Sequence, residues 1–167
     1  MRIYIFNIFI IILIMMPFTL HAESYQHCNE KLDALLHSSR YKTNIYTGKH
    51  VKTPVLNHVT RRFRTQFQSA LTASSKVVMA GHYLVTAWGC GAPCYGLGWI
   101  DIKNGKGFLG PTYSYNSETL PDSMIIINDR PESQEQIDKT SFMNPSAYKV
   151  KSDGTYKLVY ACKLKHD

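Results

Sequence analysis

The chain contains four cysteines, Cys28, Cys90, Cys94 and Cys162, and they restrict its fold more than any other feature. An even number of cysteines is typical of a disulfide framework in an exported protein. Cys90 and Cys94 flank a short turn sequence with a glycine and a proline, whereas Cys28 and Cys162 lie near the two ends of the chain. We therefore favour the pairs Cys90–Cys94 and Cys28–Cys162. The two crossed arrangements stay open.

Residues 1–22 have the pattern of a secretory signal peptide. A positive charge near the N-terminus precedes an apolar run over residues 3–16, and Ala22 offers a small residue for cleavage. The rival interpretation is a membrane anchor, but the run is shorter than the ~20 apolar residues that span a bilayer, and it ends at Pro17. We expect a periplasmic or secreted protein with no stable membrane anchor after cleavage. Residues 23–167 have the length of a single domain.

The chain is basic, with a formal net charge of +7 and a pI near 9.2. For an exported protein the acidic partners are membrane head groups, cell-wall polymers or an acidic protein. The Lys and Arg residues are scattered, and no basic run is interleaved with aromatic residues, so the pattern does not indicate nucleic-acid binding. A basic balance also keeps a small exported protein soluble.

The periodicity of apolar residues changes along the chain from a helical to a strand pattern. The helical patterns come first, and the strand patterns follow them as hairpins. This order predicts an α+β fold with N-terminal helices packed on one face of an antiparallel β-sheet. The polar stretch 129–144 is expected to be a loop. Helices are expected at 28–38 and 58–73, and strands at 77–88, 95–102, 124–127, 147–150 and 156–162, with turns at Asn104-Gly105 and Ser152-Asp153-Gly154.

The segment Trp88–Cys94, together with the preceding Gly81-His82-Tyr83, is the main candidate for a functional site. We expect His82, Tyr83, Trp88 and Tyr95 to form a binding surface, because large aromatic rings suit protein recognition. Gly81 within a strand pattern indicates a bulge or a close approach of another backbone.

Gly96 and Gly98 alternate along the next strand and leave one of its faces bare. The bare face would receive Trp88 or another aromatic ring, or it would form a ligand groove. The sequence leaves both alternatives open.

His82 with Cys90 and Cys94 would supply three ligands for zinc or copper, and a cysteine with His82 would supply a catalytic pair. However, redox pairs space their cysteines by two residues and not three. Moreover, six residues separate His82 from Trp88, which is roughly 20 Å along an extended strand. We therefore predict no catalytic residue, no metal site and no cofactor.

The chain resembles a group of small exported bacterial proteins in the order of its segments Phe63-Arg64-Thr65, Ala80-Gly81-His82-Tyr83, Trp88-Gly89-Cys90-Gly91 with Cys94, and Ile100-Asp101 before Asn104-Gly105. The resemblance covers about residues 63–105 and implies export and a shared fold, without any catalytic residue. A fainter similarity, carried by Gly81-His82-Tyr83 and the disulfide context, is to the periplasmic lysozyme inhibitors of β-rich fold.

The leading hypothesis is an exported, disulfide-stabilised binding protein with a protein or cell-wall partner. In its more concrete form, the protein is an inhibitor or immunity protein directed against an enzyme that acts on the cell wall. The alternatives are a periplasmic enzyme that uses His82 with a cysteine or a bound metal, and a structural component of the envelope.

Overall fold

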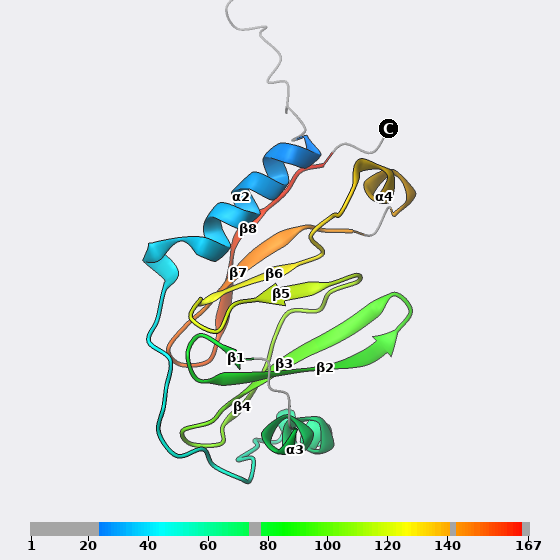
Figure 1. Cartoon of the computed structure of the whole chain (residues 1–167). Helices are drawn as coiled ribbons and strands as arrows, with labels where there is room; N and C mark the ends of the chain where they lie inside the picture. Colours follow the sequence, from blue (N-terminus) through cyan, green and yellow to red (C-terminus); the bar gives the residue numbers. More distant parts are fainter. Residues whose placement is uncertain (1–23, 74–77, 141–142, 165–167) are drawn as a thin grey trace, which may run out of the picture.

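The computed structural model describes residues 24–73, 78–140 and 143–164, so the predicted signal peptide lies outside the described residues. The described residues form helices and strands in the order shown in Figure 1. The helices are α2 (Tyr25–His37), η1 (Ser39–Tyr41), η2 (Thr60–Phe63), α3 (Arg64–Thr72) and α4 (Gln134–Lys139). The strands are β1 (Val78–Met79), β2 (Tyr83–Gly91), β3 (Cys94–Asp101), β4 (Gly107–Leu109), β5 (Ser117–Thr119), β6 (Ile125–Asn128), β7 (Ser146–Val150) and β8 (Tyr156–Ala161).

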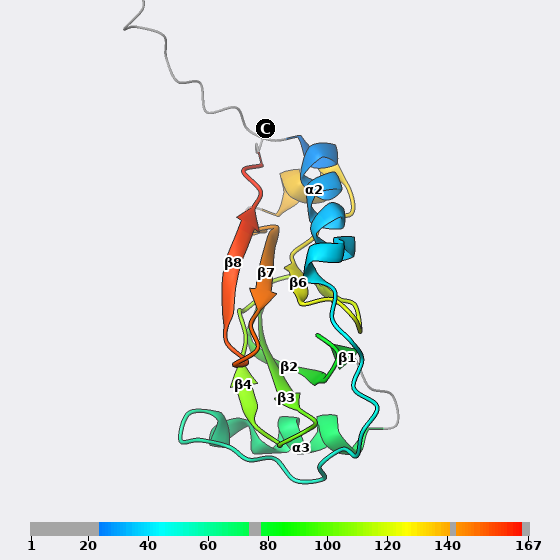
Figure 2. The ribbon, with the colours of Figure 1, turned by 90° about the vertical axis from the view of Figure 1, so that its left-hand side faces the viewer.

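The strands form two antiparallel sheets of four strands each, in the orders β1-β2-β3-β4 and β5-β6-β7-β8. Helix α2 packs on β6 and β7, whereas α3 packs on β2 and β3. The two helices lie at opposite ends of the molecule (Figure 2). The α+β class and the antiparallel pairing are as predicted. The expectation of one sheet with both helices on one face is corrected: each sheet has an apolar face that needs its own helix.

Helix α2 begins after Ser24, whose side chain accepts a hydrogen bond from the backbone N–H of His27. Cys28, Leu32 and Leu36 recur at steps of four residues and are fully buried. They form one core with Ile125, Ile127 and Ala147 of the β5–β8 sheet. The disulfide Cys28–Cys162 joins the start of this helix to the residue that follows β8.

A turn at Asn57 precedes η2, and the side-chain oxygen of Asn57 accepts hydrogen bonds from the backbone N–H groups of Val59 and Thr60. Phe67 and Leu71 of α3 are buried. They pack on the face of the β1–β4 sheet formed by Leu84, Ile100 and Ile102. The apolar side of the helix expected at 58–73 is thus the face that packs on this sheet.

The two sheets meet in a third core. Its buried residues are Met79, Ala80, Tyr83, Leu97, Trp99, Ile126 and Val150. Trp99 is fully buried, and its indole N–H donates a hydrogen bond of 3.0 Å to the carbonyl of Gly154 in the turn between β7 and β8. This bond satisfies the one polar atom of the ring while crossing from one sheet to the other.

The strand expected over 77–88 is divided by a turn at Ala80–His82, and its first residue, Val77, lies outside the described residues. Gly81 has a φ of +74°, and a Cβ there would lie 2.1 Å from the carbonyl oxygen of Asn44. The predicted close approach of another backbone is therefore confirmed.

The stretch 129–144 was predicted to be a loop throughout, but it contains α4, and β5 was not predicted at all.

The four cysteines form Cys28–Cys162 and Cys90–Cys94, which is the favoured pairing. Among the described residues, no helix combines the length and the apolar character needed to cross a bilayer.

The two disulfides should differ in their effect on stability because their loops differ in length. The pairs are separated by 134 and 4 residues. By the loss of entropy in the unfolded chain, the longer loop should stabilise the folded state by about 5 kcal/mol and the shorter loop by about 2 kcal/mol. We expect Cys28→Ser/Cys162→Ser to lower the free energy of unfolding by clearly more than Cys90→Ser/Cys94→Ser, as measured by denaturant titration. Equal losses would contradict this ranking.

Candidate functional site

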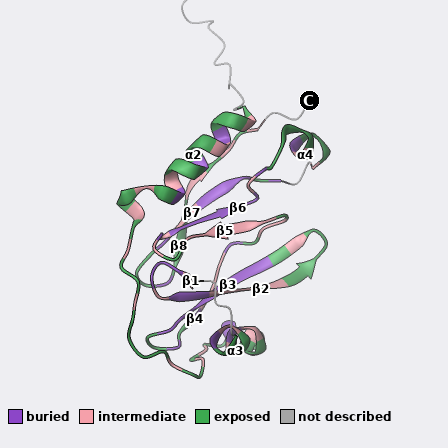
Figure 3. Cartoon of the chain, in the orientation of Figure 1, coloured by how far each residue is buried: buried purple, intermediate pink, exposed green. Residues whose placement is uncertain are grey.

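The β2–β3 hairpin brings the predicted segment Trp88–Cys94 to an exposed end of the β1–β4 sheet. Strand β1 pairs only with the first two residues of β2, and β4 pairs with residues 98–100 of β3. The rest of the hairpin extends beyond both edge strands, where Figure 3 shows it as largely exposed. The disulfide Cys90–Cys94 closes its end, with Cα atoms 5.1 Å apart. The sequence therefore correctly indicated a disulfide-closed turn at this place.

Trp88 covers the bare face of β3. A Cβ on Gly96 would lie 2.4 Å from Nε1 of Trp88, and a Cβ on Gly98 would lie 3.0 Å from its ring carbons. The other side of the indole stacks on Phe63, with ring centroids 4.1 Å apart. The two glycines therefore serve the packing of Trp88, and the ligand groove that the sequence left open is not formed at this face.

Tyr95 and Tyr113 form a pair of stacked rings beside the hairpin end. Their centroids are 5.3 Å apart and their planes are inclined by 19°. The two backbones exchange hydrogen bonds of 2.8 and 3.0 Å, which fixes the pair. Tyr95 is 45% exposed, and Tyr113 is half-buried, which raises the pKa of its hydroxyl. Tyr113 was not predicted as a site residue, because it becomes a neighbour of Tyr95 only through the fold.

His82 and Tyr83 lie at the opposite end of β2 from the disulfide. Tyr83 is 2% exposed and belongs to the core between the sheets, and burial raises its pKa to about 12. The ring of His82 is half-buried and lies against Tyr83, with centroids 4.2 Å apart. The four predicted residues thus do not form one surface: Tyr95 lies at the hairpin end, Trp88 supports it, and the other two stabilise its base.

The cysteines of the hairpin are joined in a disulfide, so neither is available as a thiolate for catalysis or metal binding. Within the described ranges, no group of three or more His, Cys, Asp or Glu side chains is arranged to hold a metal ion.

Among the hollows on the described surface, one lies beside the hairpin and another beside α2. One, of 220 Å³, lies between the hairpin and the β5–β8 sheet and is lined by residues that include Val85, Thr86 and Tyr113. It is smaller than the ~300 Å³ at which typical ligand sites begin. The other, of 420 Å³, lies between α2 and β8. There Lys31 Nζ lies 5.2 Å from the centroid of the Tyr160 ring, so a cation–π contact crosses the hollow.

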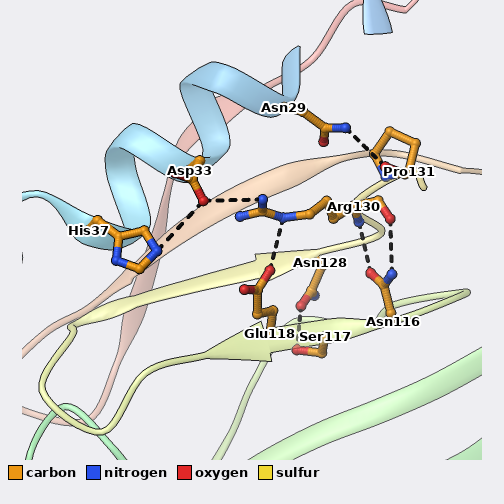
Figure 4. Close-up of polar contacts among 9 residues, drawn as sticks. All are labelled: Asn29, Asp33, His37, Asn116, Ser117, Glu118, Asn128, Arg130 and Pro131. Atoms are coloured by element: carbon orange, nitrogen blue, oxygen red, sulfur yellow. Dashed lines mark hydrogen bonds and ion pairs between the residues drawn. The ribbon is translucent and has the colours of Figure 1, made fainter. Parts of the chain in front are cut away.

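Arg130 is the centre of a polar cluster that connects α2 to the β5–β8 sheet (Figure 4). Its guanidinium forms ion pairs with Glu118 at 2.9 Å and with Asp33 at 3.5 Å. Its backbone N–H and C=O are both bonded to the side chain of Asn116. Because both carboxylates pair with the same guanidinium, the cluster has a structural role: it holds α2 against the β5–β8 sheet.

Asp129, directly before Arg130, is buried and has a φ of +56°. Its carboxylate accepts hydrogen bonds from the backbone N–H groups of Ser114 and Tyr115, both 2.8 Å long. Burial raises the pKa of this carboxyl, although these bonds oppose the shift. Asp129 thus fixes the loop that presents Tyr113 to the hairpin.

Comparison with protein-family models, curated proteins and solved structures finds no significant match to this chain. The resemblance noted from the sequence therefore stays a prediction.

A side chain at position 96 should displace Trp88, because the indole occupies the space of a Cβ there. We expect Gly96→Ala to lower the free energy of unfolding by about 1 kcal/mol or more and to shift the emission of Trp88 towards that of an exposed indole. The matched control is Gly89→Ala, since a Cβ at Gly89 meets nothing within 4 Å. Equal effects of the two substitutions would contradict the packing described for Trp88.

His82 should make the stability of the protein depend on pH. Burial, with Lys103 as the next largest cause, lowers its pKa from the usual 6.5, so the unfolded state binds this proton more readily than the folded state. Neutral His82 therefore contributes to the free energy of unfolding above pH ~6.5. This contribution is lost as the pH falls from that value through the lower pKa of the folded state. We expect His82→Gln to reduce the fall in the free energy of unfolding between pH 7.5 and 5, measured by denaturant titration. Parallel curves for the two proteins would contradict this role.

Proposed function

We propose that this protein is an extracytoplasmic binding protein that recognises another protein through the end of the β2–β3 hairpin. The observation that carries the proposal is the exposed hairpin end, which is closed by a disulfide and bears the Tyr95–Tyr113 pair. The predicted signal peptide and two disulfides support an exported location, because such bonds persist in oxidising compartments.

The hairpin end is fixed before any partner arrives. The disulfide restrains its tip, Trp88 packs on Phe63 below it, and Tyr113 holds the exposed ring of Tyr95. A surface that is already ordered loses little conformational entropy on binding. Tyrosine rings also give a large contact area at low entropic cost, which makes Tyr95 the main expected contact.

A projecting end favours a concave partner. Residues 89–93 are all exposed, and the hollow beside the hairpin is small for a ligand. A substrate cleft of an enzyme is concave, so a cell-wall-acting enzyme is a partner class that fits the shape. In this form of the proposal, the protein is an inhibitor or immunity protein that inserts the hairpin into such a cleft.

The position of the interface can be tested by photo-crosslinking in the envelope of an exporting bacterium. A photoreactive amino acid would replace Ala92 at the hairpin tip, and a control protein would carry it at Lys157 on β8, which is also exposed. We expect a defined crosslinked protein from position 92 and not from position 157. Crosslinks from both positions alike, or from neither, would contradict the proposal.

The crosslinked partner then allows a quantitative test with purified proteins. We expect Tyr95→Ala to weaken binding by about tenfold or more, because exposed tyrosines at the centre of an interface contribute strongly. Leu158→Ala removes an exposed side chain of β8 and should leave the affinity unchanged. For an enzyme partner, the same ranking should hold for inhibition of its activity on cell-wall material.

A further inference from the structure

The net charge of the chain arises from one continuous stretch, residues 43–117. This stretch contains eight Lys and Arg residues and one acidic residue, Asp101, whereas the other eleven Lys and Arg residues are balanced by eleven Asp and Glu residues. The formal charge of +7 therefore belongs to the part of the chain that contains η2, α3 and the β1–β4 sheet.

Seven of these eight cationic residues lie within the described ranges, and all seven are exposed. They come from the segment 49–64 and from the turn between β3 and β4, which lie together around α3 at one end of the molecule (Figures 1 and 2). We call this region the basic end. Its cationic residues are Lys49, Lys52, Arg61, Arg62, Arg64, Lys103 and Lys106.

Backbone contacts hold these residues on one surface. The N–H of Val55 donates a hydrogen bond of 2.7 Å to the carbonyl of Gly105, which places the segment 49–57 beside the β3–β4 turn. The side chain of Gln68 donates to the carbonyl of Lys52 at 3.0 Å, which holds the same segment against α3. A hollow of 320 Å³ lies between this segment and the η2–α3 helices, and it is lined by Pro54, Leu56, Arg61 and Arg64.

The basic end lacks neutralising partners. Asp101 is buried, and its two carboxylate oxygens accept hydrogen bonds from the backbone N–H of Lys103 and the side chain of Asn104. Across the described parts of the chain, no ion pair involves any of the seven cationic side chains. Like charges gathered without counter-charges raise the local potential and attract an anionic surface.

Exposed aliphatic side chains accompany the charges. Val55 is 59% exposed, Val59 is 38% exposed, and Ile45, earlier in the same connection, is 54% exposed. Arg is enriched at protein interfaces, but Lys, which supplies four of the seven cationic residues, is depleted there. Exposed aliphatic groups beside Lys and Arg are instead the combination by which proteins bind at the surface of a bilayer.

We propose that the basic end binds the surface of a membrane that contains anionic phospholipids. Arg61 and Arg64 contact lipid phosphate groups, to which guanidinium ions bind through paired hydrogen bonds, and the neighbouring lysines add long-range attraction. Val55 and Val59 enter the boundary between head groups and acyl chains. This attachment is peripheral, and it is separate from the hairpin contact proposed above.

The proposal can be tested by sedimentation of the oxidised, exported protein with vesicles. The vesicles would contain phosphatidylcholine alone or a mixture with phosphatidylglycerol. We expect binding to the mixed vesicles only, and a decrease in binding as salt screens the charges. Arg61→Glu/Arg64→Glu should weaken binding by roughly 30-fold or more. The matched control, Lys151→Glu/Lys157→Glu, makes the same change of charge at exposed positions of the other sheet and should change binding by less than about twofold.

Binding to a soluble polyanion distinguishes whether the partner is a lipid surface or an acidic protein. With polyglutamate as probe, Val55→Ser/Val59→Ser should have no effect, whereas the same change should weaken vesicle binding severalfold. Binding to polyglutamate without binding to vesicles would overturn the proposal in favour of an acidic polypeptide. Equal losses in the two charge-reversal variants would also overturn it. Circular dichroism and the midpoint of denaturant unfolding establish that each variant is folded.

Discussion

The contact of Trp99 with the β7–β8 turn is the interaction on which the rest of the structure depends. The indole is fully buried on a central strand of one sheet, and it donates its hydrogen bond to Gly154 of the other. Tyr83 reaches towards the same turn, with its hydroxyl 3.5 Å from the carbonyl of Ser152. These two rings hold the bases of β2 and β3, and so they set the direction in which the hairpin end extends.

Local structure could be predicted from the sequence because it depends on neighbouring residues. The helix at 28–38, the Asn-Gly turn after β3 and the Ser-Asp-Gly turn before β8 were all expected on this basis. The division into two sheets could not be predicted, since it involves contacts between residues far apart in the chain, such as that of Trp99 with a turn 55 residues away. The packing of Trp88 over Gly96 was one of the two open alternatives, and the geometry of the hairpin decides between them.

Two of the sequence interpretations failed for physical reasons. Tyr83 was placed on a binding surface because tyrosines suit recognition, yet its ring fills the space between two sheets that were expected to be one. The cationic residues seemed scattered because they are not consecutive, whereas the feature that matters is the near absence of acids between residues 43 and 117. The β1–β4 sheet and the segments packed on it therefore carry both proposed surfaces, whereas the β5–β8 sheet and α2 belong to the part of the chain whose charges balance.

The disulfide between Cys28 and Cys162 has a consequence for the order of disulfide formation if the chain is exported, as we propose. A chain that emerges amino end first exposes Cys28 long before its partner, at a separation of 134 residues. In that interval the first available cysteines are Cys90 and Cys94, only 4 residues apart, which pair with each other across a short hairpin. Once Cys90 and Cys94 are paired with each other, Cys162 is the one cysteine left to pair with Cys28.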